Sequence, residues 1–398
     1  MAENKDKKVL NVPHLRFPEF SGEWEMASLQ DIAAINPKSD QLQNTFIYID
    51  LEAVEKGELR KIQEIMREEA PSRAQRVIDN NDILFQCVRP YQKNNYIHRI
   101  LNTSNQQWVA STGYAQIRTT ELPNYIYHLL NTDGFNRKVM VRCTGSSYPA
   151  INSEDLATIR FYYTPDKKEQ FKISRLLDLI DERIATQNKI IEDLKKLKSA
   201  ISKQAFAQKP NGWNRLDTLF SKGKAGGTPT STNKEYYNGE IPFLSINDIT
   251  KQGKYVRYTE NHLSRSGLEN SSAWVVPEYS LIISMYASVG LVTINEVPIT
   301  TSQAMFAMQL RDKDLLDYLY YYLSYFKYRH IHKYLETGTQ SNINADIVRG
   351  IMIPTYGHSR NMKIASTLQS IDAKIDNELS VLKLFYRQKN YLLSQMFI

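Results

Sequence analysis

The sequence predicts an α+β protein: two mixed α/β domains separated by a pair of long helices that form an antiparallel coiled coil, with a pseudo-twofold internal repeat. Three observations lead to this prediction. Residues 166–207 contain no glycine or proline, and their apolar residues recur at steps of three, four and seven. Residues 358–398 carry the same pattern. Short motifs that precede the two segments also recur, whereas the sequences between those motifs differ.

The apolar pattern over residues 166–208 predicts one central helix, and that over 358–398 predicts a second. At 1.5 Å per residue, a helix of roughly forty residues is about 60 Å long, so its apolar stripe must be covered by a partner. Gln187 and Lys198 are polar interruptions in the first stripe. We assign to the coiled-coil interface Ile173, Leu177, Ile180, Ile184, Ile191, Leu194, Ile364, Leu368, Ile371, Ile375, Leu382 and Phe385.

The two helices are copies of one segment. Ile173 and Ile364 are 191 positions apart, and at that offset the pattern L-x-x-I-D-x-x-I of residues 177–184 recurs at 368–375. A period near 190 residues indicates duplicated domains rather than solenoid units. The predicted parts are an N-terminal arm (1–22), a first domain (23–165), the central helix (166–208), a second domain (209–357) and the C-terminal helix (358–398).

Composition limits the class of protein. The chain has 398 residues, enough for two or three domains, and a net charge of +7 that favours a polyanionic partner, although a mildly basic protein with no nucleic-acid role remains an alternative. Two cysteines give neither a disulfide framework nor a metal-ligand pair. The polar N-terminus lacks the apolar core of a signal peptide, and no run of eighteen apolar residues occurs. We therefore expect a soluble, cytoplasmic protein.

The remaining elements follow in chain order. Leu15, Phe17 and Phe20, spaced by prolines, predict an extended arm that lies on a neighbouring surface. The other segments are assigned from their periodicity. They are a short helix over 24–35, strands at 44–50, 161–163, 241–249 and 281–284, an Asn-Asn-Asp turn and a buried strand within 77–88, a buried strand pair within 280–294 and a helix over 314–335.

Three segments mix cations, amides and hydroxyls. Residues 89–96 combine Arg, Asn, Gln and Tyr in a loop that Pro90 should keep extended, a mixture suited to phosphate contacts and to base edges. Residues 144–148 form a polar turn. Residues 221–230 are rich in Gly, Lys and Thr but lack the Gly-Lys-Ser/Thr ending of a phosphate-binding loop, so we interpret them as a flexible basic loop. An ordinary solvated loop is the alternative for residues 89–96.

No catalytic motif is evident. A methyltransferase Asn-Pro-Pro-aromatic motif, a Walker loop and His or Cys pairs at metal-ligand spacing are all missing. A nuclease pattern assembled from Asp166 with Asp193 and Lys195 would place its parts roughly 40 Å apart along a straight helix, too far to share a metal ion. We therefore assign no catalytic residue, metal site or cofactor to this chain.

The chain resembles the specificity subunits of type I restriction–modification enzymes over nearly its whole length. The resemblance rests on VPHLRFPEFSGEW at 12–24, DILFQCVRPY at 82–91, GGTPTSTNKEYYNGEIPFLSINDI at 226–249 and L-x-x-I-D-x-x-I on both helices. It implies two target-recognition domains that read a bipartite, asymmetric DNA target. It also implies assembly with two modification (adenine methyltransferase) subunits and with restriction subunits, which would bind S-adenosylmethionine, ATP and Mg²⁺ and carry out catalysis. Helices of this length would separate the two half-targets by about 15 base pairs.

Under this resemblance we assign DNA contacts to polar residues of the candidate loops. In the first domain they are Arg73, Arg76, Arg89, Tyr91, Lys93, Asn94, Ser146, Ser147 and Tyr148. In the second they are Lys222, Lys224, Thr228, Thr230, Ser231, Lys234, Tyr286, Thr339, Gln340 and Ser341. Phe17, Phe20 and Phe206 are candidate contacts to a partner subunit. Two alternatives stay open: a coiled-coil assembly or inhibitory protein without DNA readout, and a nuclease with an unrecognised site.

Overall fold

The computed structural model describes residues 11–99, 106–331 and 342–398. The chain divides into two compact units: unit 1 comprises residues 1–188 and 380–398, and unit 2 comprises residues 189–379. Each unit therefore takes part of both long helices. Within the described ranges, no helix has both the length and the apolar character needed to cross a membrane.

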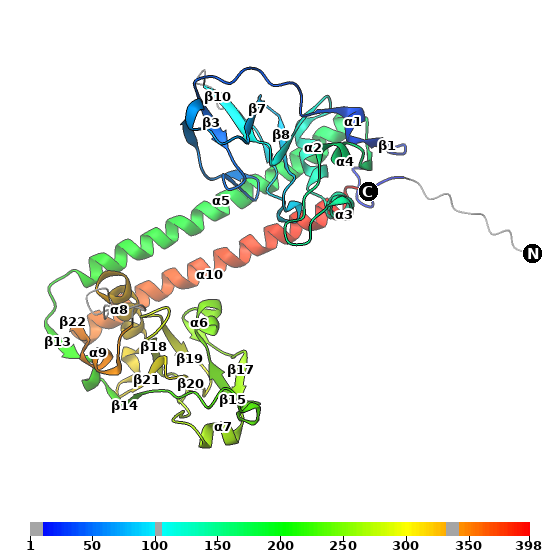
Figure 1. Cartoon of the computed structure of the whole chain (residues 1–398). Helices are drawn as coiled ribbons and strands as arrows, with labels where there is room; N and C mark the ends of the chain where they lie inside the picture. Colours follow the sequence, from blue (N-terminus) through cyan, green and yellow to red (C-terminus); the bar gives the residue numbers. More distant parts are fainter. Residues whose placement is uncertain (1–10, 100–105, 332–341) are drawn as a thin grey trace, which may run out of the picture. The chain divides into compact units, whose positions relative to one another are not determined.

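Unit 1 contains two four-stranded sheets and two two-stranded ribbons (Figure 1). One sheet has the order β6-β3-β10-β7, in which β3 and β10 are parallel; the other is fully antiparallel with the order β2-β11-β8-β9. The elements are β1 (Glu25–Ser28), α1 (Leu29–Ile32), β2 (Ala33–Ile35), β3 (Thr45–Ile49), β4 (Val54–Glu55), β5 (Glu58–Leu59), β6 (Gln63–Met66), β7 (Ala74–Ile78), β8 (Ile83–Gln86), β9 (Tyr96–Ile97), β10 (Gln107–Ser111), β11 (Tyr114–Thr119), α2 (Pro123–Leu130), α3 (Asp133–Arg142), α4 (Ser153–Ala157) and β12 (Arg160–Tyr163).

Unit 2 contains a five-stranded sheet, a three-stranded sheet and a two-stranded ribbon. The larger sheet has the order β14-β21-β18-β19-β16, and the smaller has the order β17-β15-β20. The elements are β13 (Gly212–Arg215), β14 (Phe220–Ala225), β15 (Tyr237–Leu244), α6 (Ile246–Gln252), β16 (Tyr255–Val256), β17 (Asn261–Leu263), α7 (Arg265–Glu269), β18 (Leu281–Ser284), β19 (Val292–Asn295), β20 (Thr300–Thr301), β21 (Met305–Leu310), α8 (Leu316–Arg329), α9 (Ala345–Gly350) and β22 (Met352–Thr355).

The two long helices are α5 (Lys167–Phe206) and α10 (His358–Gln395), and both are unbroken. In unit 1 the first part of α5 packs with the last part of α10, where Asp181 and Lys389 form an ion pair of 2.5 Å. In unit 2 the last part of α5 packs with the first part of α10, where Lys198 and Asp372 form an ion pair of 2.5 Å. The helices are therefore antiparallel within each unit.

The assigned interface residues on the helices are buried to different degrees. Ile173, Leu177, Ile180, Ile184, Ile191, Leu368 and Ile375 are buried, and Leu194, Ile364, Ile371, Leu382 and Phe385 are half-buried. In unit 1 the first four also pack against the core beneath the sheets, together with Trp24 and Phe397. The apolar stripe of α5 thus contributes both to the contact with α10 and to the core of unit 1.

The two units repeat several local structures. β1 pairs with β12 in unit 1, and β13 pairs with β22 in unit 2, both antiparallel and both just before a long helix. Asn152 and Asn344 cap α4 and α9 by accepting a backbone N–H three residues ahead. Tyr125 on α2 packs against Phe397, and Tyr318 on α8 packs against Phe206. The divergent sequence lies between these recurring structures.

Three sequence predictions were wrong in part. Residues 24–35 form a single helical turn between two strands, because Glu25–Ser28 pairs with β12 and a reciprocal cap between Ser28 and Asp31 starts the turn. The strand over 241–249 ends at Leu244, where Ser245 caps α6. The helix over 314–335 ends at Arg329, and residues 332–335 lie outside the described ranges. The strand at 44–50 and the strand pair within 280–294 are confirmed.

A polar network joins the second domain to both long helices in unit 2. The hydroxyl of Tyr321 on α8 donates to Asp372 at 2.8 Å, and Asp372 also pairs with Lys198. Burial, followed by the facing carboxylate of Asp372, raises the pKa of Tyr321, so the phenol remains a donor. Lys254 donates to the same phenol oxygen at 3.2 Å. Asp372 therefore connects three helices.

Replacing Asp372 with Asn should lower the free energy of unfolding of unit 2 by about 1–3 kcal/mol, because the ion pair to Lys198 is lost and the phenol of Tyr321 loses a charged acceptor. Urea unfolding followed by circular dichroism measures this change. Asp193→Asn on the exposed face of α5 is the matched control and should change stability by less than about 0.5 kcal/mol. Equal losses in the two variants would contradict the role given to Asp372.

Candidate nucleic-acid interface

Unit 1 brings two of the candidate loops together. Val88 and Ala150 form a bridge, the N–H of Arg89 donates to the carbonyl of Pro149 at 2.7 Å, and the N–H of Ile151 donates to the carbonyl of Cys87 at 3.0 Å. The segment that follows β8 and the turn at 144–150 are therefore one surface, which we call head 1. It contains Arg89, Tyr91, Lys93, Asn94, Ser146, Ser147 and Tyr148.

Arg89 is positioned by an unusual backbone conformation. Its φ of 53° is left-handed, and Pro90–Gln92 then forms a 3₁₀ turn, so the expectation of an extended loop was wrong. Proline suits the first position of such a turn because its φ is already helical. The guanidinium lies 4.3 Å from the ring centroid of Tyr148. Stacking on the ring leaves the edge of the guanidinium available for hydrogen bonds in the ring plane.

The turn that carries Tyr148 requires glycine at one position. Gly145 has a φ of +90°, and a Cβ there would come within 2.9 Å of the carbonyl oxygen of Tyr148. Ser146 and Ser147 follow it and are exposed, and the Tyr148 side chain is 64% exposed. Tyr91 on the adjacent loop is 51% exposed. Head 1 thus presents two aromatic rings and two hydroxyls beside one cation.

Other predicted contacts in unit 1 already have partners within the chain. Lys93 pairs with Asp133 at 2.6 Å and donates to the carbonyl of Asn131 at 3.1 Å. The side-chain oxygen of Asn94 accepts the N–H of Lys56 at 2.9 Å. These two residues stabilise the base of head 1, and their side chains are less free to read a ligand.

Arg73 and Arg76 belong to a different sheet from the strand that leads to Arg89. Arg76, on β7, donates from Nε to the carbonyl of Tyr114 at 2.9 Å, and burial lowers the pKa of its half-buried guanidinium. Arg73 precedes β7 and is exposed. Of the two side chains, that of Arg73 is therefore the more accessible.

Burial keeps two titratable groups of unit 1 neutral, one near each end of β8. Burial raises the pKa of the Cys87 thiol to about 12, so this cysteine is protonated and unreactive at neutral pH. Burial also lowers the pKa of His98 to about 4, and neither ring nitrogen has a hydrogen-bond partner among the described residues. His98 follows β9, which pairs with the strand that leads to Arg89. The N–H of His98 donates to the carbonyl of Asp82 at 2.8 Å, so this ring lies at the start of β8, the end opposite Arg89.

In unit 2 the basic segment is a strand rather than a loop. Lys222 and Lys224 belong to β14, which pairs antiparallel with β21, so the prediction of a flexible loop over 221–230 was wrong for its first half. The Nζ of Lys222 lies 4.3 Å from the Trp274 ring, and that of Lys224 lies 5.9 Å from it. Both lysines are exposed, and they form a short cationic ridge.

The glycines after β14 are required by close packing. A Cβ on Gly226 would lie 1.9 Å from the carbonyl oxygen of Thr301, and one on Gly227 would lie 2.2 Å from the Ser272 hydroxyl. Residues 226 and 227 therefore pack too closely against Thr301 and Ser272 for any residue other than glycine at either position. The segment delivers Thr228, whose hydroxyl donates to Gln303, and then the exposed residues Thr230, Ser231 and Lys234.

Tyr286 lies in a second loop of unit 2. The loop follows β18, and the N–H of Ile343 donates to the carbonyl of Met285 at 3.0 Å. This bond corresponds to the one between Ile151 and Cys87 in unit 1, and Ala287 has a φ of 58°, close to that of Arg89. We call the surface formed by β14, the segment 226–234 and this loop head 2. Thr339, Gln340 and Ser341 lie outside the described residues.

Three residues of head 2 were not predicted from the sequence. Arg349 donates to the carbonyl of Gly223 at 3.3 Å, and its guanidinium lies 5.2 Å from the ring of Phe306. Trp274 stacks against the two lysines, and Gln303 accepts from Thr228. Arg349 follows the repeated Ile-Asn motif at 343–344, which could have indicated it; no sequence signal indicated Trp274 or Gln303. Within the described part of the chain, no three His, Cys, Asp or Glu side chains are grouped to hold a metal ion.

Comparisons with known proteins agree with this organisation. Residues 21–196 and 210–383 each match the family described as the type I restriction modification DNA specificity domain. The chain is 21% identical over 382 residues to the type I restriction enzyme HindI specificity subunit of Haemophilus influenzae, covering 75% of this chain and 78% of the relative. It is 26% identical over 158 residues to the MjaIX specificity subunit of Methanocaldococcus jannaschii, covering 38% and 36%.

Solved structures share the fold. A chain from a structure of type I R-M system assembly and conformational transition has a TM-score of 0.61 at 21% identity, covering 94% of this chain and 97% of the other. The crystal structure of the type I restriction–modification S subunit from M. genitalium has a TM-score of 0.59 at 14% identity, covering 97% and 99%.

The pKa of His98 predicts a pH dependence of stability. The folded-state pKa of about 4 lies below the ordinary value of 6.5, so the unfolded chain binds more protons between these values. Stability should therefore be complete above pH 6.5 and should fall as the pH drops from 6.5 to 4, by about 3 kcal/mol at most. His98→Phe keeps an aromatic ring and should remove this part of the slope. Denaturant titrations of both proteins at pH 7 and pH 5 provide the test; parallel slopes would contradict it.

Proposed function

The chain belongs to the type I restriction–modification DNA specificity family, and on that premise we propose that it is a sequence-specific DNA-binding subunit with one reading head in each unit. Each head would read one part of a bipartite, asymmetric target. The observation that carries this proposal is the repeated loop geometry: a strand, a left-handed residue and a bond to the residue before a helix N-cap occur in both units. The side chains on that geometry differ, as two different half-targets require.

In head 1, Arg89 is the proposed base-reading residue. Bidentate contact of arginine with guanine in the major groove needs a guanidinium held in a fixed plane, and the ring of Tyr148 provides this at 4.3 Å. Ser146, Ser147 and Tyr91 flank it as hydrogen-bonding and stacking groups, and Arg73 is a proposed phosphate contact. Lys93 and Asn94 would support the loop.

In head 2, Lys222 and Lys224 are the proposed phosphate contacts. They lie on a paired strand beside Trp274, so their charges are fixed to a rigid element. Thr228, Thr230, Ser231 and Lys234 extend this surface, and Tyr286 contributes from the adjacent loop. Arg349 joins the proposed set because it is bonded to the carbonyl of Gly223 on the same strand.

We further propose that the chain is not itself an enzyme and binds no cofactor. Adenine methylation and cleavage would be carried out by two modification subunits and by restriction subunits, which would bind S-adenosylmethionine, ATP and Mg²⁺. The absence of known catalytic motifs from the sequence supports this division of labour. Two competing hypotheses predict other results. A coiled-coil protein without DNA readout should show no salt-sensitive binding to a duplex. A nuclease should cut DNA as the purified chain with Mg²⁺ alone.

Replacing Arg89 with Ala should relax or weaken recognition of one half-target by about 1–3 kcal/mol at the affected base pair and leave the other half unchanged. Mapping of methylated sites in cells that carry this chain and a modification subunit measures the effect on each half separately. Arg183→Ala, an exposed arginine on α5, is the control and should leave both halves intact. Equal loss at both halves would contradict two independent heads.

The double variant Lys222→Ala, Lys224→Ala should weaken duplex binding similarly for all sequences. Each lysine that contacts a phosphate contributes about 0.9 to the slope of log affinity against log salt, so the slope should fall by nearly 2. Fluorescence anisotropy with a labelled duplex at several salt concentrations measures the slope. An unchanged slope would remove β14 from the proposed interface.

A further inference from the structure

The N-terminal arm covers the start of α5 in unit 1. Arg16 forms two hydrogen bonds with Glu169, of 2.7 and 2.9 Å, and the Glu169 side chain is buried. The Nζ of Lys172 lies 5.5 Å from the ring of Phe17 and 5.9 Å from that of Phe20. The arm thus combines one charged contact with two aromatic rings. It was predicted to lie on a neighbouring surface, and the surface it covers is the first two turns of α5.

Further bonds fix the two ends of this contact. Lys172 also pairs with Glu19, between the two phenylalanines. The N–H of Leu15 donates to the carbonyl of Gln395 at 2.9 Å, which ties the arm to the end of α10. In unit 1 the arm therefore lies over the site where one long helix begins and the other ends.

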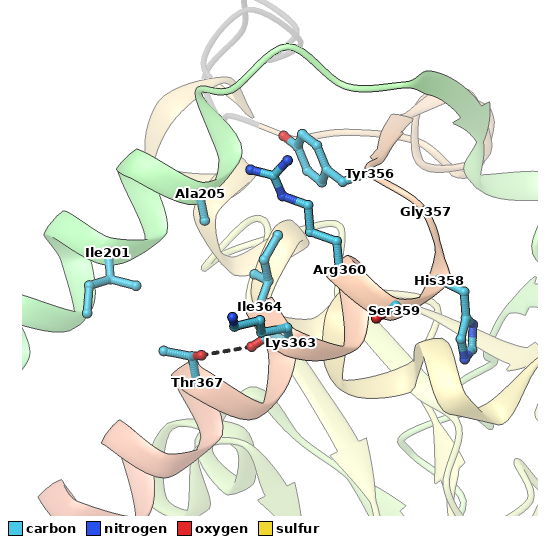
Figure 2. Close-up of a pocket in the computed structure, with 10 residues that line it drawn as sticks. All are labelled: Ile201, Ala205, Tyr356, Gly357, His358, Ser359, Arg360, Lys363, Ile364 and Thr367. Carbon is cyan, nitrogen blue, oxygen red and sulfur yellow. Dashed lines mark hydrogen bonds between the residues drawn. The ribbon is translucent and has the colours of Figure 1, made fainter.

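The internal repeat places the corresponding site in unit 2. At the offset of 191 positions, Glu169 and Lys172 correspond to Arg360 and Lys363, and Gln395 corresponds to Gln204. Arg360 and Lys363 line an open groove of about 700 Å³ between the start of α10 and the end of α5. Figure 2 shows Ile201 and Ala205 on α5 across the groove from Ile364 on α10.

The apolar residues of this groove are less covered than their counterparts in unit 1. Ile173 is 1% exposed and Met396 is 2% exposed, whereas the corresponding Ile364 and Ala205 are only half-buried. Leu392 is buried, and the corresponding Ile201 is half-buried. The short link after α5 lies beside the groove, where the side-chain oxygen of Gln208 accepts a hydrogen bond from Arg360. The guanidinium of Arg360 lies 5.6 Å from the ring of Tyr356 and is exposed (Figure 2).

We propose that this groove, which we call the α10 groove, is a docking site for an extended segment of a partner protein that carries a carboxylate followed by an aromatic side chain. The residue that binds Arg16 of the arm in unit 1 is the acidic Glu169, and its counterpart in unit 2 is the basic Arg360. The charge at this position is therefore reversed. The occupant must therefore present an acidic group where the arm presents Arg16. Lys363 retains the character of Lys172 and suits an aromatic ring or a second carboxylate.

The same charges argue against two other occupants. A second copy of this chain would bring its Arg16 against Arg360, a repulsive contact between like charges. A free phosphate would satisfy the cations but leave the apolar side chains of Ile201, Ala205 and Ile364 exposed. The inference rests on the proposed function only in that this chain is taken to assemble with other proteins; it does not depend on how either head reads DNA.

The test uses the full chain and two fluorescein-labelled peptides. One peptide has the sequence of residues 11–22, and the other has the same sequence with Arg16 replaced by Glu. The Glu peptide should bind the wild-type chain about tenfold more tightly than the Arg peptide, because it pairs with Arg360 and is repelled from Glu169 in unit 1. Arg360→Glu should reverse this preference. Fluorescence anisotropy measures both affinities.

Two controls separate the alternatives. Arg387→Glu, at an exposed position of the same helix, should keep the wild-type preference, and thermal unfolding should show that both variants fold. Equal binding of the two peptides, a preference unaffected by Arg360→Glu, or displacement of the Glu peptide by millimolar phosphate alone would overturn the proposal. Duplex binding by the Arg360→Glu chain should equal that of the wild type, so a failure of peptide docking is distinguishable from a failure of the proposed DNA readout.

Discussion

Each unit is completed by a helical segment that is distant in sequence, and the ion pairs between α5 and α10 fix how it is placed. Asp181 pairs with Lys389 in unit 1, and Lys198 pairs with Asp372 in unit 2. At the offset of 191 positions Asp181 corresponds to Asp372 and Lys198 corresponds to Lys389. The two ion pairs are therefore equivalent contacts of the internal repeat. All four side chains are partly shielded from solvent. A shift of one helix along the other would separate both pairs and leave these charges uncompensated next to an apolar seam, which selects one register.

This constraint extends into the cores of the domains. The end of α10 contributes Phe397, which lies 6.2 Å from Trp24 and 5.4 Å from Tyr125. The end of α5 contributes Phe206, which packs against Tyr322 and Tyr325. Phe206, considered in the sequence analysis as a contact to a partner subunit, is thus buried in unit 2 and unavailable for that role. The last residues of each long helix thus belong to the core of a unit, although they lie far in sequence from the strands of that unit.

The parts of the structure that depend on periodicity and repetition were predictable from the sequence. The seam of α5 and α10 follows from residues at heptad spacing. The repeated Ile-Asn pairs at 151–152 and 343–344 mark equivalent positions, and the fold shows that Asn152 and Asn344 cap α4 and α9 there. Local patterns failed where tertiary pairing decided the outcome. Residues 25–28 form a strand because β12 is beside them, and residues 220–225 form a strand because β21 is beside them. Propensity within a short window carries no information about a partner more than eighty residues away.

The candidate heads were predicted less completely, because their geometry depends on contacts between loops distant in sequence. The pairing of Arg89 with Tyr148 joins two candidate segments that the sequence could only treat separately. Lys93 was selected as a ligand contact because it is a cation in a polar loop, and its pairing with Asp133 became visible only in the fold. Trp274 was missed for the same reason, since nothing near it in sequence is basic.

The left-handed residues at the two heads indicate how such a surface can exchange a side chain while its backbone conformation is kept. A non-glycine residue at positive φ costs about 1–2 kcal/mol, and it persists only where surrounding bonds require that conformation. Arg89 and Ala287 both adopt it, although one side chain is long and charged and the other is a methyl group. The bonds that flank them are between backbone atoms: Ile151 to Cys87 in unit 1 and Ile343 to Met285 in unit 2. Because those bonds do not involve the side chain at the turn, that side chain can be exchanged while the backbone of the loop is kept.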